Sequence, residues 1–457
     1  MTALQPMAAG SRASTGLLAC LMAALALLFA TTRAEAMKIQ VVKSPGGVTA
    51  WLVEEHSVPM LAMRFAFEGG SAQDPVGKEG IANFLAGMLD EGAGDIRSKE
   101  YQERMEEIAM RMSFDDARDA FYGSFETLTE NRDAAAKLLA LALSKPRFDA
   151  DAVDRVRGQL LANLAYAARD PNRVAAEAWG AMAFAGHPYG RPTNGTPATV
   201  QGITREDLAE FWGRTFARDN LRVVVVGDID AATLAQMLDS VFGALPAKGQ
   251  LTPVAPTQPA STEKQQVIEM AVPQSVARFG LPALPRSDKD FMAAFVLNTI
   301  LGGGSMSSRL WEEVREKRGL AYSVYTAVQP YKHTSVFTGG VATKNEEIVQ
   351  SLDVIRGELE RIATEGPTEK ELADAKSFLT GSFVLRFDSN AKIANQLLWF
   401  WQEDMGIDYV DRRNPEIEAL TLEDVKRAAK RLFDGKDLIV TIVGKPKGLA
   451  ATPGRRS

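Results

Sequence analysis

Apolar runs predict strands at matching places in the two halves of the chain. The first half has such runs at 60–67 and 223–226, and the second half has them at 276–281 and 439–443. Segments expected to form helices lie between the early and the late run of each half, and a closing helix precedes each last strand. This order predicts an α+β fold, in which each half is a mixed or antiparallel sheet covered by helices.

The two halves also repeat each other in sequence. The segments ITRED at 203–207 and LTLED at 420–424 stand at the same distance before the glycine that follows each closing strand. Both are typical of a helix start, a capping box in which Asp takes the place of Glu. Val-Pro recurs in the same way near the start of each half, at 58–59 and 272–273. This internal duplication predicts two homologous tandem domains.

Composition places the boundaries between these domains. The segment LPAKGQLTPVAPTQPASTEK, at 245–264, is rich in Pro, Thr, Ser and Ala and lacks apolar periodicity, as is typical of a linker. We therefore predict a first domain over 37–245, a linker over 246–264, a second domain over 265–446 and a disordered tail over 447–457.

The first 36 residues differ from the rest of the chain. Arg12 precedes an apolar stretch at 17–30, and Ala-Glu-Ala at 34–36 matches the A-x-A pattern of a signal cleavage site. We predict a cleaved signal peptide over 1–36 and export to the periplasm. The one cysteine of the chain, Cys20, lies in this segment. A mature chain without thiols suits an oxidising compartment, and it can be neither disulfide-bonded nor a thiol enzyme.

Composition and charge argue against nucleic acid as a partner and against a membrane-spanning segment. Hydrophobic residues make up 46% of the chain and charged residues 24%, as in an ordinary globular protein, and the formal net charge is −6. Because no stripe of basic residues is present, the sequence does not indicate nucleic-acid binding. Because no segment after the signal is apolar for long enough, it does not indicate a membrane span either.

Three segments carry a family resemblance. GGSAQDPVGKEGIANFLAGMLDEGAG, at 69–94, resembles the segment of pitrilysin/insulinase-type zinc peptidases, the inverzincins, in which a helix carries H-x-x-E-H. GHPYGRPTNGTPATVQGIT, at 186–204, and LGGGSMSSRLWEEVREKRGLAYSVY, at 301–325, also resemble this family. The resemblance is to the bacterial half-length type. It implies two similar α+β domains per chain, and two such chains that close like a clamshell over a peptide.

The metal chemistry of that family is missing from this chain. In the family the two His bind zinc and the Glu activates the attacking water. The five matching positions here are Asn83, Phe84, Leu85, Ala86 and Gly87. The third family ligand, a Glu on a later helix, falls at about Ala162 or Asn163, in a helix interior without carboxylates. We therefore predict a degenerate zinc site at Asn83, Ala86 and Gly87, and no metal or other cofactor held by this chain.

No other catalytic arrangement is indicated by the sequence. His56, His187 and His333 lie far apart, and none has a second His at metal-ligand spacing. We interpret His187 as a residue that holds its own loop. Because no G-x-S-x-G motif is present, an independent hydrolase with an unrecognised site is the least favoured interpretation.

An Arg/Tyr pair at Arg315 and Tyr322 resembles the pair that the family carries in a second-half domain. There the pair reaches across the cleft to the substrate bound at zinc. A guanidinium and a phenol can donate hydrogen bonds to a developing oxyanion or to a substrate carbonyl. The alternative is that Tyr322 is a core strand residue and Arg315 one cation on a charged helix face with Glu312, Glu313, Glu316, Lys317 and Arg318. The surrounding match favours the functional interpretation.

Two further features leave more than one interpretation. Gly302, Gly303 and Gly304 lack the Gly-Lys-Ser/Thr that continues a nucleotide-binding loop. They resemble instead the glycine-rich loop of the non-catalytic subunit of mitochondrial processing peptidase, which helps to take up substrate. Substrate binding and a flexible connection between helices are both open for these glycines. The aromatic residues at 399–401 have helical spacing, which is more typical of a core than of a peptide contact.

These observations lead to one hypothesis and one alternative. The hypothesis is the non-catalytic subunit of a heterodimeric periplasmic zinc metallopeptidase, inactive alone. A homologous H-x-x-E-H chain would be its partner and would bind the zinc, while this chain would supply Arg315 and Tyr322 to the peptide substrate. The alternative is a peptide-binding or scaffold protein that has a peptidase-like fold and no catalytic role.

Overall fold

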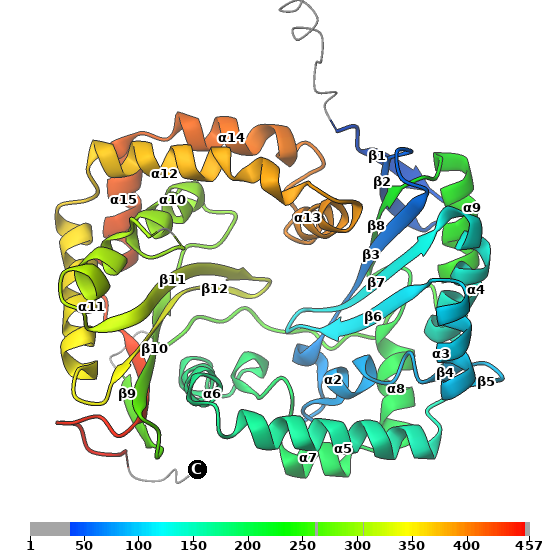
Figure 1. Ribbon diagram of the computed structural model, residues 1–457, viewed down its shortest axis with the longest axis horizontal. Coiled ribbons are helices and arrows are strands. Elements are labelled where there is room, and N and C mark those ends of the chain that lie inside the picture. Colours follow the sequence, from blue (N-terminus) through cyan, green and yellow to red (C-terminus); the bar gives the residue numbers. More distant parts are fainter. Residues whose placement is uncertain (1–36, 261–263, 305, 453–457) are drawn as a thin grey trace, which may run out of the picture. The chain divides into compact units, whose positions relative to one another are not determined.

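The first half of the chain builds a six-stranded sheet in the order β1-β2-β8-β3-β7-β6 (Figure 1). Strands β2 and β8 are parallel, and the other neighbours are antiparallel. β6 therefore lies at one edge and β1 at the other. The strands are β1 (Gln40–Lys43), β2 (Thr49–Glu54), β3 (Met60–Glu68), β6 (Arg111–Asp116), β7 (Ala120–Leu128) and β8 (Leu221–Gly227).

The second half repeats this topology in a five-stranded sheet in the order β11-β12-β10-β13-β9. The closing strand of each half, β8 or β13, is parallel to one neighbour and antiparallel to the other. This shared pairing confirms the predicted α+β fold of two homologous domains with mixed sheets. The strands are β9 (Lys264–Glu269), β10 (Gln274–Pro282), β11 (Ala321–Tyr331), β12 (Thr334–Lys344) and β13 (Ile439–Gly444).

Helices cover the sheets, and each half has its own apolar core (Figure 1). The first half contains α2 (Ile81–Ala86), α3 (Ser98–Glu107), α4 (Arg132–Ser144), α5 (Ala150–Ala167), α6 (Pro171–Ala183), α7 (Pro197–Gly202), α8 (Arg205–Thr215) and α9 (Ala231–Phe242). The second contains α10 (Phe291–Leu301), α11 (Ile348–Thr364), α12 (Glu369–Gly381), α13 (Asn390–Gln402), α14 (Tyr409–Ala419) and α15 (Leu422–Phe433).

The computed structural model describes residues 37–260, 264–304 and 306–452. The predicted signal peptide and residues 453–457 of the predicted tail lie outside these ranges. Within the described ranges, none of the helices has both the length and the apolar character needed to cross a membrane.

The predicted capping boxes begin the two closing helices. At α8 the Thr204 hydroxyl accepts the backbone N–H of Asp207 at 3.2 Å, and the Asp207 carboxylate accepts the N–H of Thr204 at 2.7 Å. Thr421 and Asp424 make the same reciprocal pair at the start of α15. Asp therefore replaces Glu in both boxes, and this prediction is confirmed.

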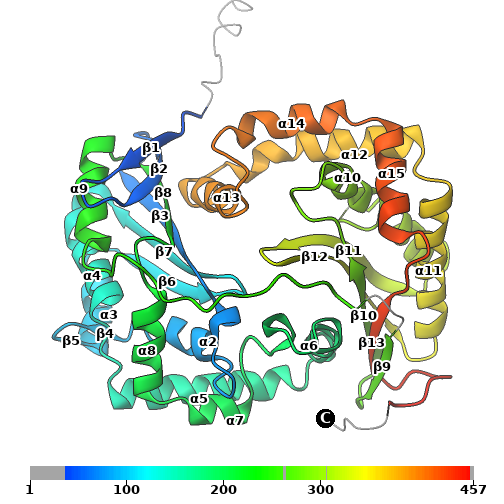
Figure 2. The ribbon, with the colours of Figure 1, turned by 180° about the vertical axis from the view of Figure 1, so that it is seen from behind.

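Each half lends one helix to the sheet of the other half. α6 of the first half packs against β10 and β13, and α13 of the second half packs against β3 and β8 (Figure 2). The Trp179 indole N–H on α6 donates to the Ile439 carbonyl at 3.1 Å. Arg64 Nε on β3 donates to the Asn395 side chain on α13 at 2.9 Å. The two sheets are thus joined by direct packing as well as by the chain connection.

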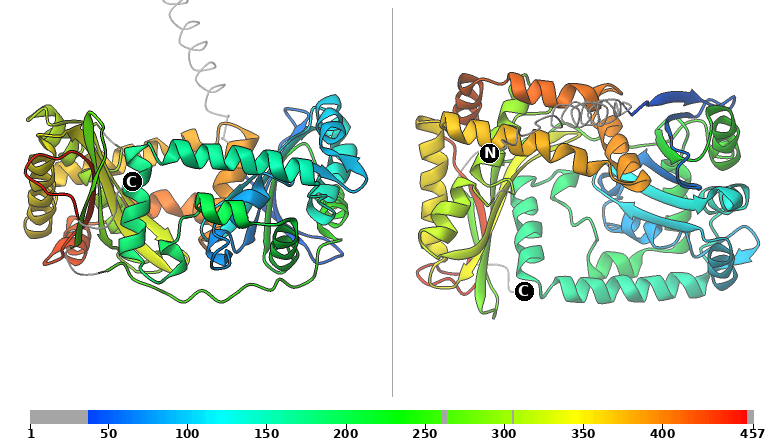
Figure 3. Two further views of the ribbon diagram at one scale, coloured as in Figure 1. Left: turned by 90° about the horizontal axis from the view of Figure 1, so that it is seen from below. Right: turned by 45° about the horizontal axis from the view of Figure 1, so that its top comes forward.

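The connecting segment at 245–260 is extended and crosses from the first half to the second (Figure 3). Its backbone is hydrogen-bonded along the way. The N–H of Gln250 donates to the Arg214 carbonyl at 2.7 Å, and the N–H of Ala260 donates to the Ala183 carbonyl at 3.1 Å. This segment, which has no apolar periodicity, is therefore held by backbone hydrogen bonds together with the packing of Leu245, Val254 and Ala260.

Candidate functional site

The helix that matches the zinc motif is short and tightly held. Helix α2 starts after Gly80, whose φ of 92° lies in the left-handed region that glycine adopts readily. The Asp74 carboxylate accepts the backbone N–H groups of Gly80 and Ala82 at 2.7 and 3.3 Å. These bonds satisfy donors that the first turn of a helix leaves free. The frame of the motif helix is therefore intact.

The residues at the motif positions of this helix have structural roles. The Asn83 amide donates to the Asp116 carboxylate at 2.9 Å and so ties α2 to the end of β6. Ala86 is buried, and Gly87 ends the helix. A Cβ at Gly87 would lie 3.1 Å from the Val156 Cγ1 atom on α5, which is tighter than ordinary packing. A side chain at this position would therefore require the Val156 side chain to shift by a few tenths of an ångström.

A pocket of about 590 Å³ lies beside the helix that matches the family motif. Asn83 lines it from α2, and Asn163, one of the two positions predicted for the third family ligand, lines it from α5. Asn194 adds a third amide, and the remaining lining residues are Leu160, Leu164, Tyr166, Ala167, Asp170 and Arg173. The pocket is thus polar and rich in neutral amides.

These residues do not fit a zinc ion. Zinc in proteins is bound by His nitrogen, Cys sulfur or carboxylate oxygen. Among the residues that the structure describes, no group of three or more His, Cys, Asp or Glu is placed to hold a metal. The amide oxygens of Asn83 and Asn163 offer no equivalent ligand set, and no base occupies position 86, which is Ala.

Two carboxyl groups, of the buried Asp74 and the half-buried Asp116, contact the motif helix. Burial raises the pKa of Asp116 to about 6, and the neighbouring Asp115 charge adds to this rise. Burial also raises the pKa of Asp74, against the opposing effect of the N–H groups that it accepts. Neither carboxyl group lines the pocket. Both hold α2 in place rather than facing a ligand.

The predicted Arg/Tyr pair comes together in the second half. Arg315 lies on a π-helical turn, η4 (Trp311–Glu316), and Tyr322 lies at the start of β11. The Arg315 guanidinium carbon is 4.5 Å from the centre of the Tyr322 ring and 3.9 Å from the centre of the Trp311 ring. Tyr322 is 79% exposed, so it is not a core residue.

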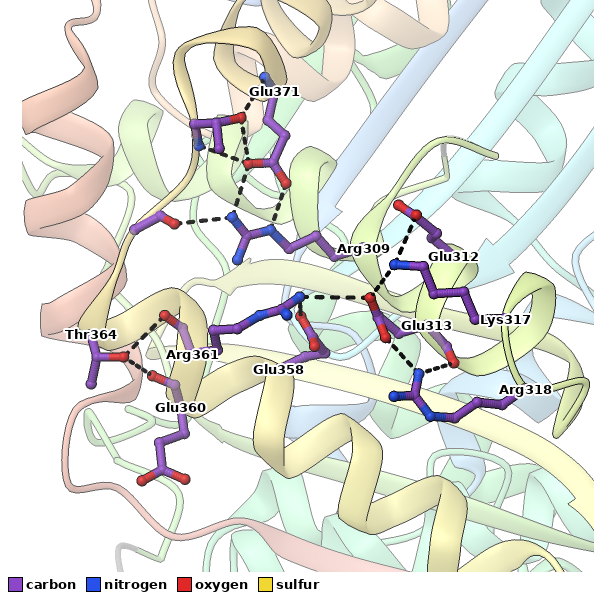
Figure 4. Close-up of polar contacts among 12 residues, drawn as sticks. Arg309, Glu312, Glu313, Lys317, Arg318, Glu358, Glu360, Arg361, Thr364 and Glu371 are labelled. Carbon is purple, nitrogen blue, oxygen red and sulfur yellow. Dashed lines mark hydrogen bonds and ion pairs between the residues drawn. The ribbon is translucent and has the colours of Figure 1, made fainter.

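Arg315 is also distinct from the other cations of its segment. Lys317 Nζ lies 2.8 Å from the Glu313 carboxylate, and Arg318 Nη1 lies 2.5 Å from it (Figure 4). Arg315 Nε is 3.7 Å from the Glu316 carboxylate, which is beyond hydrogen-bond distance. The nearby acidic side chains thus pair mainly with the other cations, and aromatic rings flank Arg315.

Packing explains two of the three predicted loop glycines. The backbone N–H groups of Gly302 and Gly303 both donate to the Asn298 carbonyl, at 2.9 and 2.7 Å. A Cβ at Gly302 would lie 2.8 Å from the Thr326 hydroxyl, and one at Gly303 would lie 2.5 Å from the Asn298 amide nitrogen. Gly304 has a φ of 100° and open space around it. A role of this loop in substrate binding stays a prediction.

His187 and the aromatic residues at 399–401 have different surroundings. His187 Nε2 contacts the Ala255 carbonyl at 2.9 Å, and its Nδ1 accepts the Tyr189 backbone N–H at 3.2 Å. His187 therefore links its loop to the connecting segment. Phe400 is buried, whereas Trp399 lines a pocket of about 820 Å³ formed by residues of both halves.

Trp311 is the residue of this site that the sequence reasoning missed. It lies four positions before Arg315, a spacing that brings side chains together on one helix face. That spacing was a usable signal, because a Trp ring is the strongest aromatic partner for a guanidinium.

Family models match most of the chain. The model described as insulinase (peptidase family M16) matches residues 51–197, and the one described as peptidase M16 inactive domain matches residues 202–379. The first range contains the degenerate motif, and the second contains Arg315 and Tyr322.

Curated relatives and solved structures agree with these matches. The non-peptidase homolog YmxG of Helicobacter pylori is 27% identical over 86% of this chain and 91% of its own length. An uncharacterized zinc protease of Streptomyces coelicolor is 27% identical over 84% of each chain. A crystal structure of a peptidase M16 inactive domain from Pseudomonas fluorescens superposes with a TM-score of 0.84 at 28% identity, covering 91% of this chain and all of that one. The chain thus belongs to the peptidase M16 family, as a non-catalytic homologue whose motif positions carry neither zinc ligand nor base.

Proposed function

We propose that this chain is the non-catalytic subunit of a heterodimeric zinc metallopeptidase in the periplasm. A homologous chain with an intact H-x-x-E-H motif supplies the zinc site and the base. This chain supplies Arg315 and Tyr322 to the peptide bound there. One observation carries the proposal: the Arg315 guanidinium is held between Trp311 and Tyr322, beside an exposed phenol, in a chain whose own zinc positions have no ligands.

The chemistry of this pair suits a peptide carbonyl. Aromatic rings lie against the guanidinium, so its N–H groups, which lie in its own plane, remain the available donors. Among the described residues, no hydrogen bond is made by either the Arg315 guanidinium or the Tyr322 hydroxyl. Donors held in this way can stabilise negative charge on a substrate oxygen.

A cleavage assay tests the proposal. The mature chain, its candidate H-x-x-E-H partner and an equimolar mixture are each incubated with a mixed fluorogenic peptide library. We expect chelator-sensitive cleavage mainly in the mixture. A partner that is equally active without this chain, or that forms no complex with it, would contradict the shared site.

Variants then locate the contribution of the pair. R315A and Y322F should each lower kcat of the mixture by about 10²–10³-fold, the usual loss for one oxyanion donor. The amount of complex, measured by size-exclusion chromatography, should stay unchanged. Because Tyr322 is exposed, Y322F has little reason to disturb the fold.

A peptide-binding or scaffold protein is the second candidate function. The amide-lined pocket around Asn83 and Asn163 favours it, since amides can pair with the backbone of a bound peptide. A scaffold predicts that R315A and Y322F leave every activity of the complex unchanged. It also predicts that bulky substitutions in the pocket, such as N163W, abolish peptide binding.

A further inference from the structure

The turn that carries Arg315 has unusual backbone geometry. In η4 the backbone N–H of Lys317 donates to the Glu312 carbonyl at 2.9 Å, five residues back. Such π-helical turns are rare and occur often at functional sites. Side-chain ion pairs hold this turn in addition to its backbone hydrogen bonds.

Glu313 makes those interactions. Its side chain is 10% exposed, and its carboxylate lies 2.8 Å from Lys317 Nζ, 2.5 Å from Arg318 Nη1 and 3.8 Å from Arg361 Nη2 (Figure 4). Arg318 Nη1 also donates to the Glu313 backbone carbonyl at 2.8 Å. Hydrogen bonds from Lys317 and Arg318 lower the pKa of Glu313 to about 2, so this carboxylate is charged in any working buffer.

The same contacts determine which cations of the segment pair with which carboxylates. Lys317 and Arg318 turn toward Glu313, on the side of α11, where Arg361 also pairs with Glu358 at 2.7 Å. Without the Glu313 carboxylate, Lys317 would keep only Glu312, 3.0 Å away, and Arg318 would keep only its bond to the backbone carbonyl of residue 313. The contact between this turn and Arg361 on α11 would be lost, and with it part of what holds the turn that carries Arg315.

We propose that Glu313 is a positioning residue, whose carboxylate anchors the π-helical turn and thereby holds Arg315 between Trp311 and Tyr322. Its expected effect on turnover rests on the proposed function of that pair. Its effect on the geometry of the three side chains does not, and it can be measured without a partner or a substrate.

Fluorine NMR of the full chain labelled with 5-fluorotryptophan measures that geometry. The chain has six tryptophans, and W311F assigns the resonance of Trp311. R315A should shift this resonance, because the guanidinium lies 3.9 Å from the ring centre. We expect E313Q, which keeps the size of the side chain and removes its charge, to shift it too. An unchanged Trp311 resonance in E313Q would overturn the proposal.

A matched control and a second variant accompany E313Q. Glu371 pairs with Arg309 through two contacts of 2.6 and 2.9 Å in the same half but lies outside the turn, so E371Q should leave the Trp311 resonance in place. If E313Q does not fold, the double variant K317Q/R318Q removes the two shorter of the three ion pairs of Glu313, and it does so from exposed side chains. That variant should shift the Trp311 resonance, and its failure to do so would equally overturn the proposal.

A double-mutant cycle on the active mixture tests whether Glu313 affects turnover through Arg315. E313Q should lower kcat by about 10–100-fold, as loss of an orienting group typically does, with little change in KM. In an R315A background E313Q should have no further effect, because both act through one guanidinium. Independent, multiplying losses would overturn the positioning role. If E313Q and R315A both shift the Trp311 resonance while turnover is unchanged, the positioning role stands and the proposed substrate contact falls.

Discussion

The indole rings of Trp51 and Trp401 lie face to face, with ring centres 4.7 Å apart and ring planes at 6° to each other. Trp51 belongs to β2 of the first half, and Trp401 belongs to α13 of the second. Next to this stack, the Tyr122 hydroxyl donates to the Gln402 side chain at 2.6 Å. Helix α13 is therefore part of the packing of the first sheet, although it comes from the other half.

This stack predicts that Trp51 contributes strongly to the stability of the fold. Trp51 is 7% exposed, so W51A should lower the free energy of unfolding by about 3–5 kcal/mol, the usual cost of truncating a buried aromatic residue. Urea denaturation followed by circular dichroism measures the loss. W399A is the control, because Trp399 is 39% exposed and should matter less. Equal losses in the two variants would contradict the importance of the stack.

Asp116 predicts a distinct pH dependence of stability. Its pKa in the fold, about 6, lies above that of an unfolded Asp. The folded state thus binds more protons between about pH 4 and 6, and this group's contribution to stability is lost as the pH rises through that window. D116N keeps an acceptor for Asn83 and removes the charge. At pH 7 it should restore about 2 kcal/mol of that loss.

Urea titrations of D116N and the unmodified chain at several pH values between 4 and 7 test this expectation. The unmodified chain should lose stability across the window more steeply than D116N. D115N is the control, since the Asp115 carboxylate is a smaller influence on the same group. Parallel stability profiles for D116N and the unmodified chain would show that Asp116 does not titrate in this range.

Local signals in the sequence predicted much of the fold. The capping boxes at Thr204 and Thr421 depend on residues three apart, and the duplicated order of elements follows from short apolar runs. The exchange of α6 and α13 was not predictable, because it depends on packing between segments far apart in sequence. An apolar helix face shows that the helix packs on a sheet, but it does not show which of the two sheets that is.

The candidate site likewise has parts that could be predicted from the sequence and parts that could not. The loss of ligands at Asn83 could be read directly, because a zinc ligand is a matter of residue identity. The meeting of Arg315 and Tyr322 could be expected from the resemblance alone. The contact of Trp311 with Arg315 could have been expected from their spacing of four residues. The part played by Glu313 could not, because a π-helical turn changes which side chains share a face and sequence patterns assume ordinary helical spacing.

The glycine loop predicts a difference between neighbouring substitutions. G303A places a Cβ 2.5 Å from the Asn298 amide nitrogen and 2.9 Å from the Asn298 carbonyl oxygen, so it should lower stability by about 1–3 kcal/mol through overpacking. G304A meets no neighbour, and only its φ of 100° opposes it. Thermal unfolding of the two variants compares these costs. A larger loss in G304A would contradict the packing explanation for Gly303.

Restoring the family motif should fail to restore a metal site. N83H, A86E and G87H rebuild H-x-x-E-H on α2, and N163E supplies a carboxylate from α5. The side chain at position 87 must enter space in which even a Cβ lies 3.1 Å from Val156 Cγ1. We expect the combined variant to be less stable than the unmodified chain and to bind zinc at well below one ion per chain.

Metal content by plasma mass spectrometry and thermal unfolding with added zinc test this expectation. N83H alone is the matched control, because it places an imidazole at a position that lines the pocket and leaves Gly87 unchanged, so its main cost should be the altered hydrogen bond to Asp116. Adding V156A to the combined variant removes the Cγ1 methyl group that the new side chain meets. Zinc binding that appears only after V156A would show that helix packing, besides the missing ligands, keeps the metal out. Full zinc binding by the combined variant with Val156 in place would show that the close packing of α2 on α5 is no barrier.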